Sequence, residues 1–313
     1  MTNRAERGGR ISVSTHDGVQ LAVRSSGPSD APMTIVFVHG HCLHGGSWSS
    51  MRRHLRDAWG DGVRMVSYDH RGHGRSAHGP AAADTIDQLG RDLNAVIEAV
   101  VPSGPVVLVG HSMGGMAALA YARAHPDSIG SRIVGMALIA TAAGGITELG
   151  LGRLLRSRAV PWLRVAVHHA PAVVQKARKF GEAASRSAAR WSRGGAESRL
   201  SAVSGALAGT TSVVTMVGFL QSLIEFDERE SLTGLMHIPS LVLCGTDDVM
   251  TPFEHSLDIA ARLPSSELVS VNGAGHSVIL ERAAEVASAV SALLSRVIDG
   301  SSLVEGALTG PVD

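Results

Sequence analysis

The 313-residue chain has only two cysteines, Cys42 and Cys244, and aromatic residues make up just 4% of it. Two cysteines are too few for a disulfide framework, so we expect reduced thiols in a reducing compartment. The formal net charge is zero, so no global field favours nucleic acid as a partner. The first ten residues, MTNRAERGGR, lack an apolar run and predict no signal peptide. These absences together predict a cytoplasmic protein.

A long hydrophobic run of the kind that crosses a membrane is also missing. Leu200 to Ile224 contains no charged residue, but serine, threonine and glycine fill many of its positions. Such a segment is too polar for a hydrocarbon core, and we expect a buried or interfacial helix there. Apolar residues at 44% and charged residues at 18% are ordinary for a globular protein, and the length allows a large core.

Apolar, β-rich runs alternate with helix-like patterns along most of the chain. Residues 11–23 hold two β-like runs around Asp17-Gly18, which indicates a hairpin. Further strands are predicted at residues 33–39, 63–69, 105–111, 133–140, 240–245 and 267–272. Helices are predicted at residues 47–58, 84–101, 113–125, 252–263 and 277–298. The alternation predicts an α/β fold with a doubly wound, mostly parallel sheet that binds ligands at the carboxyl ends of its strands.

The alternation breaks after Gly144, where helix-like sequence continues to about Leu235 without a convincing strand. Arginine and lysine greatly outnumber acidic residues between Gly144 and Leu200, and residues 159–174 are mostly apolar. This stretch is typical of a helical lid over an apolar pocket. The predicted parts are a first core segment at 1–143, a helical cap at 144–235, a second core segment at 236–298 and a flexible tail at 299–313.

Gly110-His111-Ser112-Met113-Gly114 is a G-x-S-x-G pentapeptide between a predicted strand and a predicted helix. In that context the serine sits at a sharp, strained corner, and larger side chains at the flanking glycines would collide. The corner exposes the hydroxyl above a helix N-terminus, whose partial positive charge favours a developing anion. Ser112 is therefore the predicted nucleophile; the alternative is a structural serine that caps the helix.

Other motifs follow the remaining strands in a fixed order. They are His39-Gly40, DHRGHGRS at 69–76, GHSMGG at 110–115, GTDDVMTP at 245–252 and GAGH at 273–276. In this order they resemble the landmarks of the α/β-hydrolase fold superfamily, of the serine esterase and lipase type with a helical cap, from about residue 16 to 298. The resemblance implies the α/β-hydrolase fold, with an acid after the seventh strand and a histidine after the eighth.

A serine hydroxyl needs a base to remove its proton, and the base needs a group that orients it. Among 15 histidines, the family order of serine, acid and histidine selects His276 as the base. Asp247 and Asp248 compete for the acid. The family spacing after Gly245 favours Asp248, which leaves Asp247 as a solvated turn residue.

The oxyanion formed on a carbonyl substrate needs preorganised donors. The resemblance implies the backbone N–H groups of Met113 and His41. The segment HGHCLHGG at 39–46 offers histidines and a cysteine, but zinc sites usually draw on separated ligand pairs with supporting contacts. We therefore expect no metal and no cofactor. His70, His73 and His111 are expected to pack and hydrogen-bond in loops, and DHRGHGRS is expected to be a structural loop rather than a phosphate cradle.

The resemblance implies a serine hydrolase that cleaves carboxylic esters with an apolar acyl part through an acyl-enzyme. Alternatives on the same fold are a cofactor-free haloperoxidase or perhydrolase, a C–C bond hydrolase and a thioesterase. A non-catalytic receptor or lipid-binding scaffold is the alternative outside enzymes. The expected partner is a small-molecule ester. The basic cap suggests peripheral contact with an anionic membrane or lipid, binding of an anionic acyl carrier such as a CoA thioester, or simply a solvated basic face.

Overall fold

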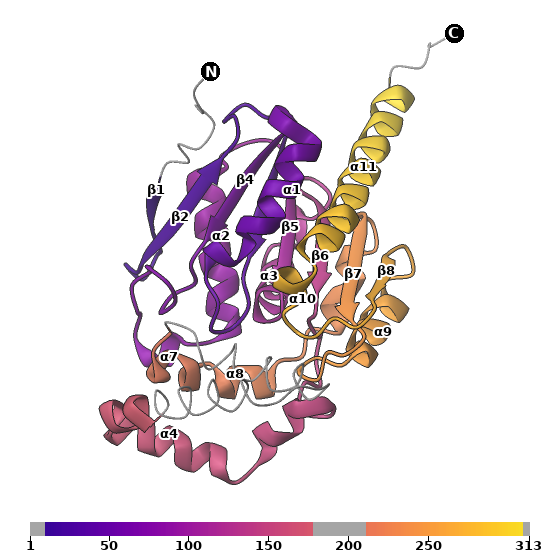
Figure 1. The fold of residues 1–313 in the computed structure, drawn as a ribbon. Helices are drawn as coiled ribbons and strands as arrows, with labels where there is room; N and C mark the ends of the chain where they lie inside the picture. The colour runs from indigo at the N-terminus through magenta and orange to yellow at the C-terminus, as the bar shows by residue number, and fades with distance from the viewer. Residues whose placement is uncertain (1–9, 178–210, 309–313) are drawn as a thin grey trace.

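An eight-stranded sheet forms the centre of the protein, whose computed structural model describes residues 10–177 and 211–308 (Figure 1). The strands are β1 Arg10–Ser14, β2 Gln20–Ser26, β3 Met33–Val38, β4 Val63–Tyr68, β5 Val106–His111, β6 Ile133–Ile139, β7 Ser240–Gly245 and β8 Glu267–Val271. Their order is β1-β2-β4-β3-β5-β6-β7-β8. β1 and β2 pair as the predicted hairpin, β2 is antiparallel to β4, and all other pairs are parallel. The predicted α/β fold with a mostly parallel sheet is confirmed.

The central strands are buried on both faces. Every residue of β3, β5 and β7 is buried, which agrees with their unbroken apolar sequences. Parallel strands read this way because helices cover both sides of the sheet.

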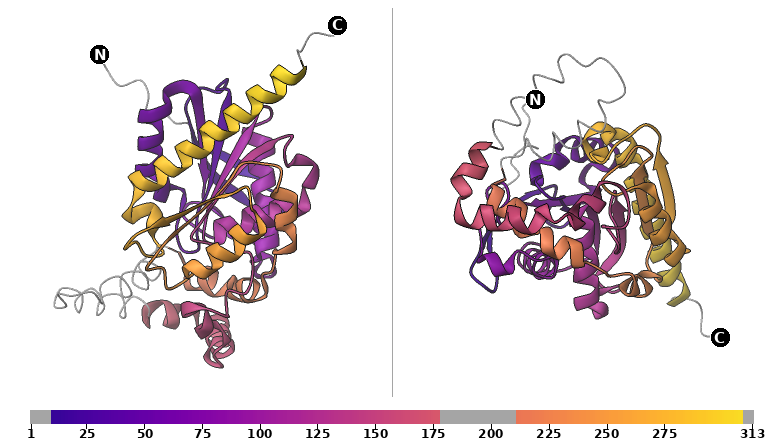
Figure 2. Two further views of the ribbon diagram at one scale, coloured as in Figure 1. Left: turned by 90° about the vertical axis from the view of Figure 1, so that its right-hand side faces the viewer. Right: turned by 90° about the horizontal axis from the view of Figure 1, so that it is seen from below.

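Helices cover the two faces of the sheet as separate layers (Figures 1 and 2). One layer holds α1 Ser49–Trp59, α10 Val278–Glu281 and α11 Ala283–Leu308, and the other holds α2 Ile86–Val100, α3 Met113–Ala124 and α9 Phe253–Arg262. Leu55 and Val290 bury apolar surface on the first face, whereas Leu93 and Leu119 do so on the second. The two apolar cores hold the strand ends, and the loops that follow them, in fixed positions.

The last helix is longer than the sequence predicts. α11 continues to Leu308, so residues 299–308 of the predicted flexible tail are helical, and residues 309–313 lie outside the described residues. A single glycine in a helix interior costs only about 1 kcal/mol, which is why Gly300 does not end the helix.

The chain between β6 and β7 forms η5 Gly150–Arg156, α4 Ala159–His169, α7 Val213–Gly218, α8 Leu220–Glu225 and η6 Glu230–Leu235. Helices α4, α7 and α8 lie together at one end of the sheet (Figure 1), whereas η6 packs against α3. A hydrogen bond from His41, just after β3, to the carbonyl oxygen of Met216 in α7 fixes this end as the carboxyl end of the parallel strands. The predicted cap at 144–235 falls here, although residues 178–210 lie outside the described part of the chain.

α4 is poorly covered. Only Val167 of this helix is buried, whereas the side chain of Trp162 is 74% exposed. Val173, in the same apolar stretch, is 68% exposed. Apolar spacing in the sequence therefore does not translate into burial here. Within the described residues, no helix is both long and apolar enough to cross a membrane.

Candidate active site

Ser112 lies at the corner between β5 and α3. Its backbone has φ 52° and ψ −123°, a left-handed conformation that is strained for a non-glycine residue. The Ser112 N–H donates to the carbonyl oxygen of Ile139 at 2.9 Å, and the Ser112 carbonyl accepts from the Thr141 hydroxyl at 2.8 Å. These two contacts, with the last residue of β6 and with Thr141 just after that strand, hold the strained corner in place.

The glycines of the pentapeptide are required by close packing. A Cβ atom at Gly110 would lie 2.6 Å from the Cα atom of Gly115, and one at Gly114 would collide with the carbonyl oxygen of Val38. The helix can approach the strands this closely only without side chains at these positions, as the sequence predicts. The corner thus presents Ser112 at the carboxyl end of the sheet.

His276 lies in the loop after β8 and faces Ser112. Its Nε2 atom is 3.0 Å from Ser112 Oγ, and its Nδ1 atom is 2.8 Å from Asp248 Oδ2. With the proton on Nδ1, the imidazole donates to the carboxylate and leaves Nε2 free to accept the serine proton. The three side chains therefore form one hydrogen-bonded chain from hydroxyl to carboxylate.

Asp248 is buried, with 4% of its surface exposed, and every contact of its carboxylate is a donor. The N–H groups of Met250 and Thr251 donate to Oδ1 at 2.8 and 2.9 Å, and the Thr251 hydroxyl donates to Oδ2 at 2.8 Å. Burial alone would raise the pKa of Asp248, but the attraction of His276 and the hydrogen bonds from His276 and Thr251 lower it below its usual value. Asp248 thus stays anionic beside the imidazole.

Asp247 points elsewhere. It is exposed, and its carboxylate accepts from the hydroxyl of Thr246 at 3.2 Å. Of the two adjacent carboxylates, the structure places Asp248 against His276.

The side chain of His111 contacts the backbone of His276. Its Nε2 atom is 2.8 Å from the carbonyl oxygen of His276, and burial lowers the pKa of His111 to about 3. The neutral ring donates this hydrogen bond and so holds the backbone of His276 in place. Sequence reasoning expected His111 to pack and hydrogen-bond but did not identify its partner, and it missed Thr141 and Thr251. Only Thr251 carried a local signal, a hydroxyl three residues after the turn aspartate.

The loop after β3 packs directly against the serine. A Cβ atom at Gly40 would lie 3.1 Å from Ser112 Cβ, which places His41 next to the site. Met113 is the first residue of α3, so its N–H has no carbonyl acceptor within the helix. The structure thus places His41 and Met113, the two residues predicted to supply the oxyanion donors, beside Ser112.

The His41 side chain has a contact of its own. Its Nε2 atom lies 3.0 Å from the carbonyl oxygen of Met216, and its ring centroid is 6.1 Å from that of Phe219. Burial lowers the pKa of His41 to about 4, although the bond to Met216 opposes this shift, so the neutral ring donates the bond. This contact ties the loop after β3 to helix α7.

The loop DHRGHGRS forms the floor beside the site. The ring of His39 stacks near those of His70 and His73, with centroids 4.3 and 5.4 Å apart, and burial holds the pKa of each ring well below its usual value. Arg71 is fully buried and pairs with Asp92 at 2.6 Å. These neutral rings and this ion pair give the loop a structural role. No group of three or more His, Cys, Asp or Glu among the described residues is arranged to hold a metal ion.

Comparisons with known proteins point in one direction. Residues 29–283 match the family described as serine aminopeptidase, S33. The chain is 36% identical over 115 residues to the bifunctional esterase/perhydrolase DCH of Acinetobacter calcoaceticus, a match that covers 37% of this chain and 40% of that protein. It is 35% identical over 116 residues to the lipase LipV of Mycobacterium tuberculosis, which covers 37% of this chain and 41% of the lipase. The chain thus spans well under two thirds of each of these two relatives.

Solved structures show the same fold along almost the whole chain. A thermophilic esterase from Thermogutta terrifontis superimposes with a TM-score of 0.70 at 23% identity, and covers 92% of this chain and 99% of the esterase. An identity this low compares folds alone. Since the family match spans most of the sequence and the fold agrees with it, the chain belongs to the serine aminopeptidase S33 family of the α/β-hydrolase superfamily.

Proposed function

We propose that the protein is a serine hydrolase that cleaves carboxylic esters with an apolar acyl part. The observation that carries the proposal is the continuous hydrogen-bonded chain from Ser112 Oγ through His276 to Asp248. Such a chain activates a hydroxyl that is otherwise a poor nucleophile. The names of the esterase and lipase relatives support the ester as the substrate.

In the proposed reaction, Ser112 Oγ attacks the ester carbonyl carbon and its proton passes to His276 Nε2. Asp248 stabilises the imidazolium that forms. The carbonyl oxygen becomes an oxyanion, which the N–H groups of Met113 and His41 bind; each donor of this kind contributes about 3 to 4 kcal/mol to the barrier reduction. When the intermediate collapses, the alcohol leaves with the proton from Nε2.

Water then hydrolyses the acyl-enzyme by the same route in reverse. His276 removes a proton from water, the hydroxide attacks the acyl carbon, and Ser112 leaves with that proton. Phe219 supports the proposal that the acyl part of the substrate is apolar. Its side chain is fully buried, and its ring contacts that of His41 beside the proposed oxyanion donors.

Perhydrolysis is the second candidate, because one relative is named as a bifunctional esterase/perhydrolase. Hydrogen peroxide would replace water as the attacker of the acyl-enzyme. The product would then be a peracid rather than an acid, with Ser112 leaving in the same way. No additional residue is needed for this step.

The test compares p-nitrophenyl esters of increasing acyl length with wild type, Ser112→Ala and the control Ser131→Ala, which alters an exposed serine after α3. We expect Ser112→Ala to lower kcat by about 10⁶-fold and Ser131→Ala to leave it unchanged. Activity retained by Ser112→Ala would contradict the assignment of Ser112 as the nucleophile. Negligible wild-type turnover at every acyl length would contradict the proposal that the substrate is an ester. Matched p-nitroanilides and peroxide trapping would then identify an amide or peracid reaction.

The surface between β6 and β7 supports a further proposal, peripheral contact with anionic lipid. The exposed basic residues of this surface are Arg153, Arg156, Arg158, Arg164 and Lys176, and no acidic residue lies between residues 149 and 177. They lie on either side of Trp162 in the sequence, and the ring of Trp162 is itself exposed. Basic residues near an exposed aromatic ring favour the surface of an anionic bilayer. The reducing compartment expected for two cysteines without a disulfide supports a cytoplasmic location as part of the same proposal.

A further inference from the structure

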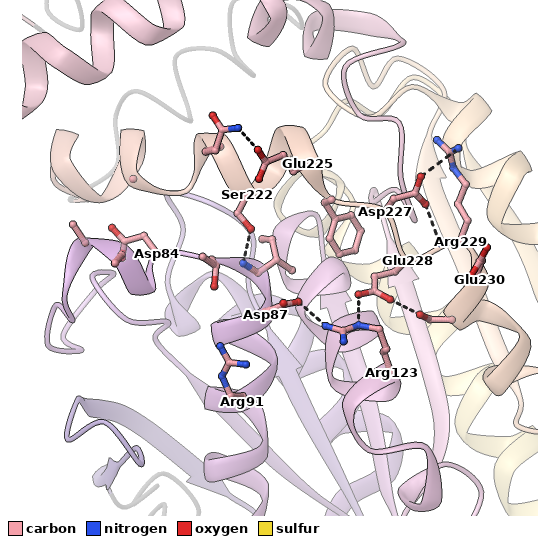
Figure 3. Close-up of a pocket in the computed structure, with 18 of the residues that line it drawn as sticks. Asp84, Asp87, Arg91, Arg123, Ser222, Glu225, Asp227, Glu228, Arg229 and Glu230 are labelled. Atoms are coloured by element: carbon pink, nitrogen blue, oxygen red, sulfur yellow. Dashed lines mark hydrogen bonds and ion pairs between the residues drawn. The ribbon is translucent and has the colours of Figure 1, made fainter.

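Two adjoining cavities lie away from the catalytic residues. The first has a volume of about 1180 Å³ and lies between the N-terminal half of α2 and helix α8 (Figure 3). The second has a volume of about 570 Å³ and lies between α4 and α7. The residues that line both are Ala81, Asp84, Arg164 and Gly218. Ser112, His276 and Asp248 line neither cavity, so these cavities form a site distinct from the proposed catalytic one.

Part of the larger cavity is already neutralised by its own ion pairs. Arg123 pairs with Asp87 at 2.7 Å and with Glu228 at 2.6 Å (Figure 3). Arg229 pairs with Asp227 at 3.5 Å. These charges satisfy one another and leave the other polar residues of the lining to interact with a ligand.

Two arginines of the cavity lining have only amide partners in the described part of the chain. Arg91 donates to the side-chain oxygen of Gln88 at 3.0 Å, and Arg164 donates to that of Gln221 at 2.9 Å. A guanidinium carries five donors, so each of these retains several for an anionic group.

Asp84 is the unusual group of the site. It is 3% exposed, and neither carboxylate oxygen accepts a hydrogen bond. His78 Nε2 lies 3.7 Å from Oδ2, beyond hydrogen-bond distance. A Cβ atom at residue 218 would overlap the same oxygen, so the carboxylate fits beneath the α7–α8 junction only because that residue is Gly218. Buried polar groups are rarely left without a partner, and a buried charge strongly favours one.

The charge state of Asp84 suits a cationic partner. Burial raises the pKa of Asp84 to about 6, against the opposing attraction of His78 and Arg71. The carboxyl group is therefore ionised above neutral pH, where it attracts an ammonium group.

The smaller cavity is mainly apolar. The aliphatic and proline residues on its walls are Pro161, Val165, Val167, Pro171, Val214 and Val217. Because Asp84 and Arg164 line both cavities, an acidic and a basic group stand where the apolar space meets the polar one. The junction therefore matches a molecule with opposite charges at the head of an alkyl chain.

We propose that the two cavities bind a single-chain zwitterionic amphiphile. Its ammonium group pairs with Asp84, its anionic group pairs with Arg164, and its alkyl chain fills the cavity between α4 and α7. The volume of the smaller cavity, about 570 Å³, lies within the range of about 300 to 1,000 Å³ that is usual for ligand sites, and the larger cavity exceeds that range. Each end of the ligand meets a wall of complementary chemistry. The proposal does not depend on ester hydrolysis, since it uses none of the catalytic residues.

Calorimetric titration of the full-length Ser112→Ala protein at pH 7.5 tests the proposal without turnover. The probe is dodecylphosphocholine below its micellar concentration. Dodecyl phosphate lacks the ammonium, dodecyltrimethylammonium lacks the phosphate, and phosphocholine lacks the chain. We expect dodecylphosphocholine to bind at least about tenfold more tightly than each of the three partial probes, because it alone makes all three contacts.

Two substitutions separate the charged contacts. Asp84→Asn should weaken dodecyltrimethylammonium binding at least about tenfold and leave dodecyl phosphate binding unchanged. Arg164→Gln should do the reverse. Arg53→Gln, an exposed arginine of α1 that lines neither cavity and lies outside the basic surface between β6 and β7, is the control and should change neither.

The comparison between probes within one variant excludes misfolding as the cause, because loss of the fold would weaken both probes together. Equal affinity of wild type and Asp84→Asn for dodecyltrimethylammonium would overturn the proposal. So would a parallel loss of both probes in Asp84→Asn and Arg164→Gln, or the absence of dodecylphosphocholine binding to wild type.

Discussion

The carboxyl end of the sheet and helix α4 are built in opposite ways. At the sheet end, Asp248 is buried and accepts from backbone and side-chain donors on both oxygens. In α4, only Val167 is buried and Trp162 is largely exposed. One region is fixed by hydrogen bonds and close packing, and the other touches the core at few points.

We infer from this difference that the rigid region carries the proposed chemistry and that the exposed region contributes to the choice of ligand. Catalytic geometry tolerates displacements of only about 0.5 Å, which requires a rigid frame such as the two-layered sheet. Ligand selection needs varied surfaces, which exposed helices provide at little cost to folding. The His41–Met216 hydrogen bond ties α7 to the sheet end, and α4 contacts α7 through Val167.

Among the tests of this comparison, the largest effect is expected on kcat, from substitution of the buried carboxylate Asp248 at the sheet end. Asp248→Asn should lower kcat by about 10⁴-fold, because the amide cannot hold the imidazole in the tautomer that accepts the serine proton. Asp247→Asn changes an exposed neighbour of the same charge and should lower kcat less than about threefold. Initial rates with a saturating p-nitrophenyl ester measure both.

Circular dichroism on the two variants controls for folding, since Asp248 also anchors the N–H groups of Met250 and Thr251. A greater loss in Asp247→Asn than in Asp248→Asn would assign the acid to the neighbouring residue. That outcome would contradict the geometry of the hydrogen-bonded chain.

Features that depend on local sequence could be predicted. The central strands follow from unbroken apolar runs, and the corner at Ser112 follows from glycines that leave room for the approach of α3 to Val38. The resemblance to the landmarks of the α/β-hydrolase fold also selected Asp248 and His276, which the structure places in one hydrogen-bonded chain with Ser112.

Features that depend on distant contacts could not be predicted. Thr141 contacts the Ser112 carbonyl from another strand end, and His111 meets the carbonyl of His276 across 165 positions of sequence. Asp84 gives no signal in the sequence either, because its burial without a hydrogen bond arises only where α7 and α8 pack over it. The exposure of Trp162 is a similar case, because apolar spacing in the sequence does not show whether a helix packs against another element.

A second effect, of intermediate size, is expected on the free energy of unfolding at acidic pH. Burial lowers the pKa values of His70 and His111 to about 3, so between about pH 3 and 6.5 the unfolded chain binds protons at these rings that the folded protein does not. The free energy of unfolding should therefore fall as the pH is lowered, by about 1.4 kcal/mol per pH unit for each ring. Asp84, with its pKa raised to about 6, acts in the opposite direction between about pH 4 and 6.

Urea unfolding at several pH values measures this slope. His111→Gln removes one titrating ring and should flatten the slope between pH 4 and 6 by about 1.4 kcal/mol per pH unit, whatever its effect on stability at pH 7. Ser131→Ala, an exposed substitution that removes no titrating group, is the control and should leave the slope unchanged. An unchanged slope in His111→Gln would show that this ring is protonated in the folded protein.

The smallest effect is expected at the exposed helix. Trp162→Ser should change the free energy of unfolding by less than about 0.5 kcal/mol, because the ring contributes little to packing. It should nevertheless weaken flotation of the protein with vesicles that contain phosphatidylserine, while Trp162→Phe retains most of the binding. Flotation at low and high salt measures the contribution of the basic residues, which salt screens. If wild type fails to float at low salt, this face does not contact anionic lipid; if Trp162→Ser instead unfolds the protein, α4 belongs to the packed frame and the contrast between the two regions is wrong.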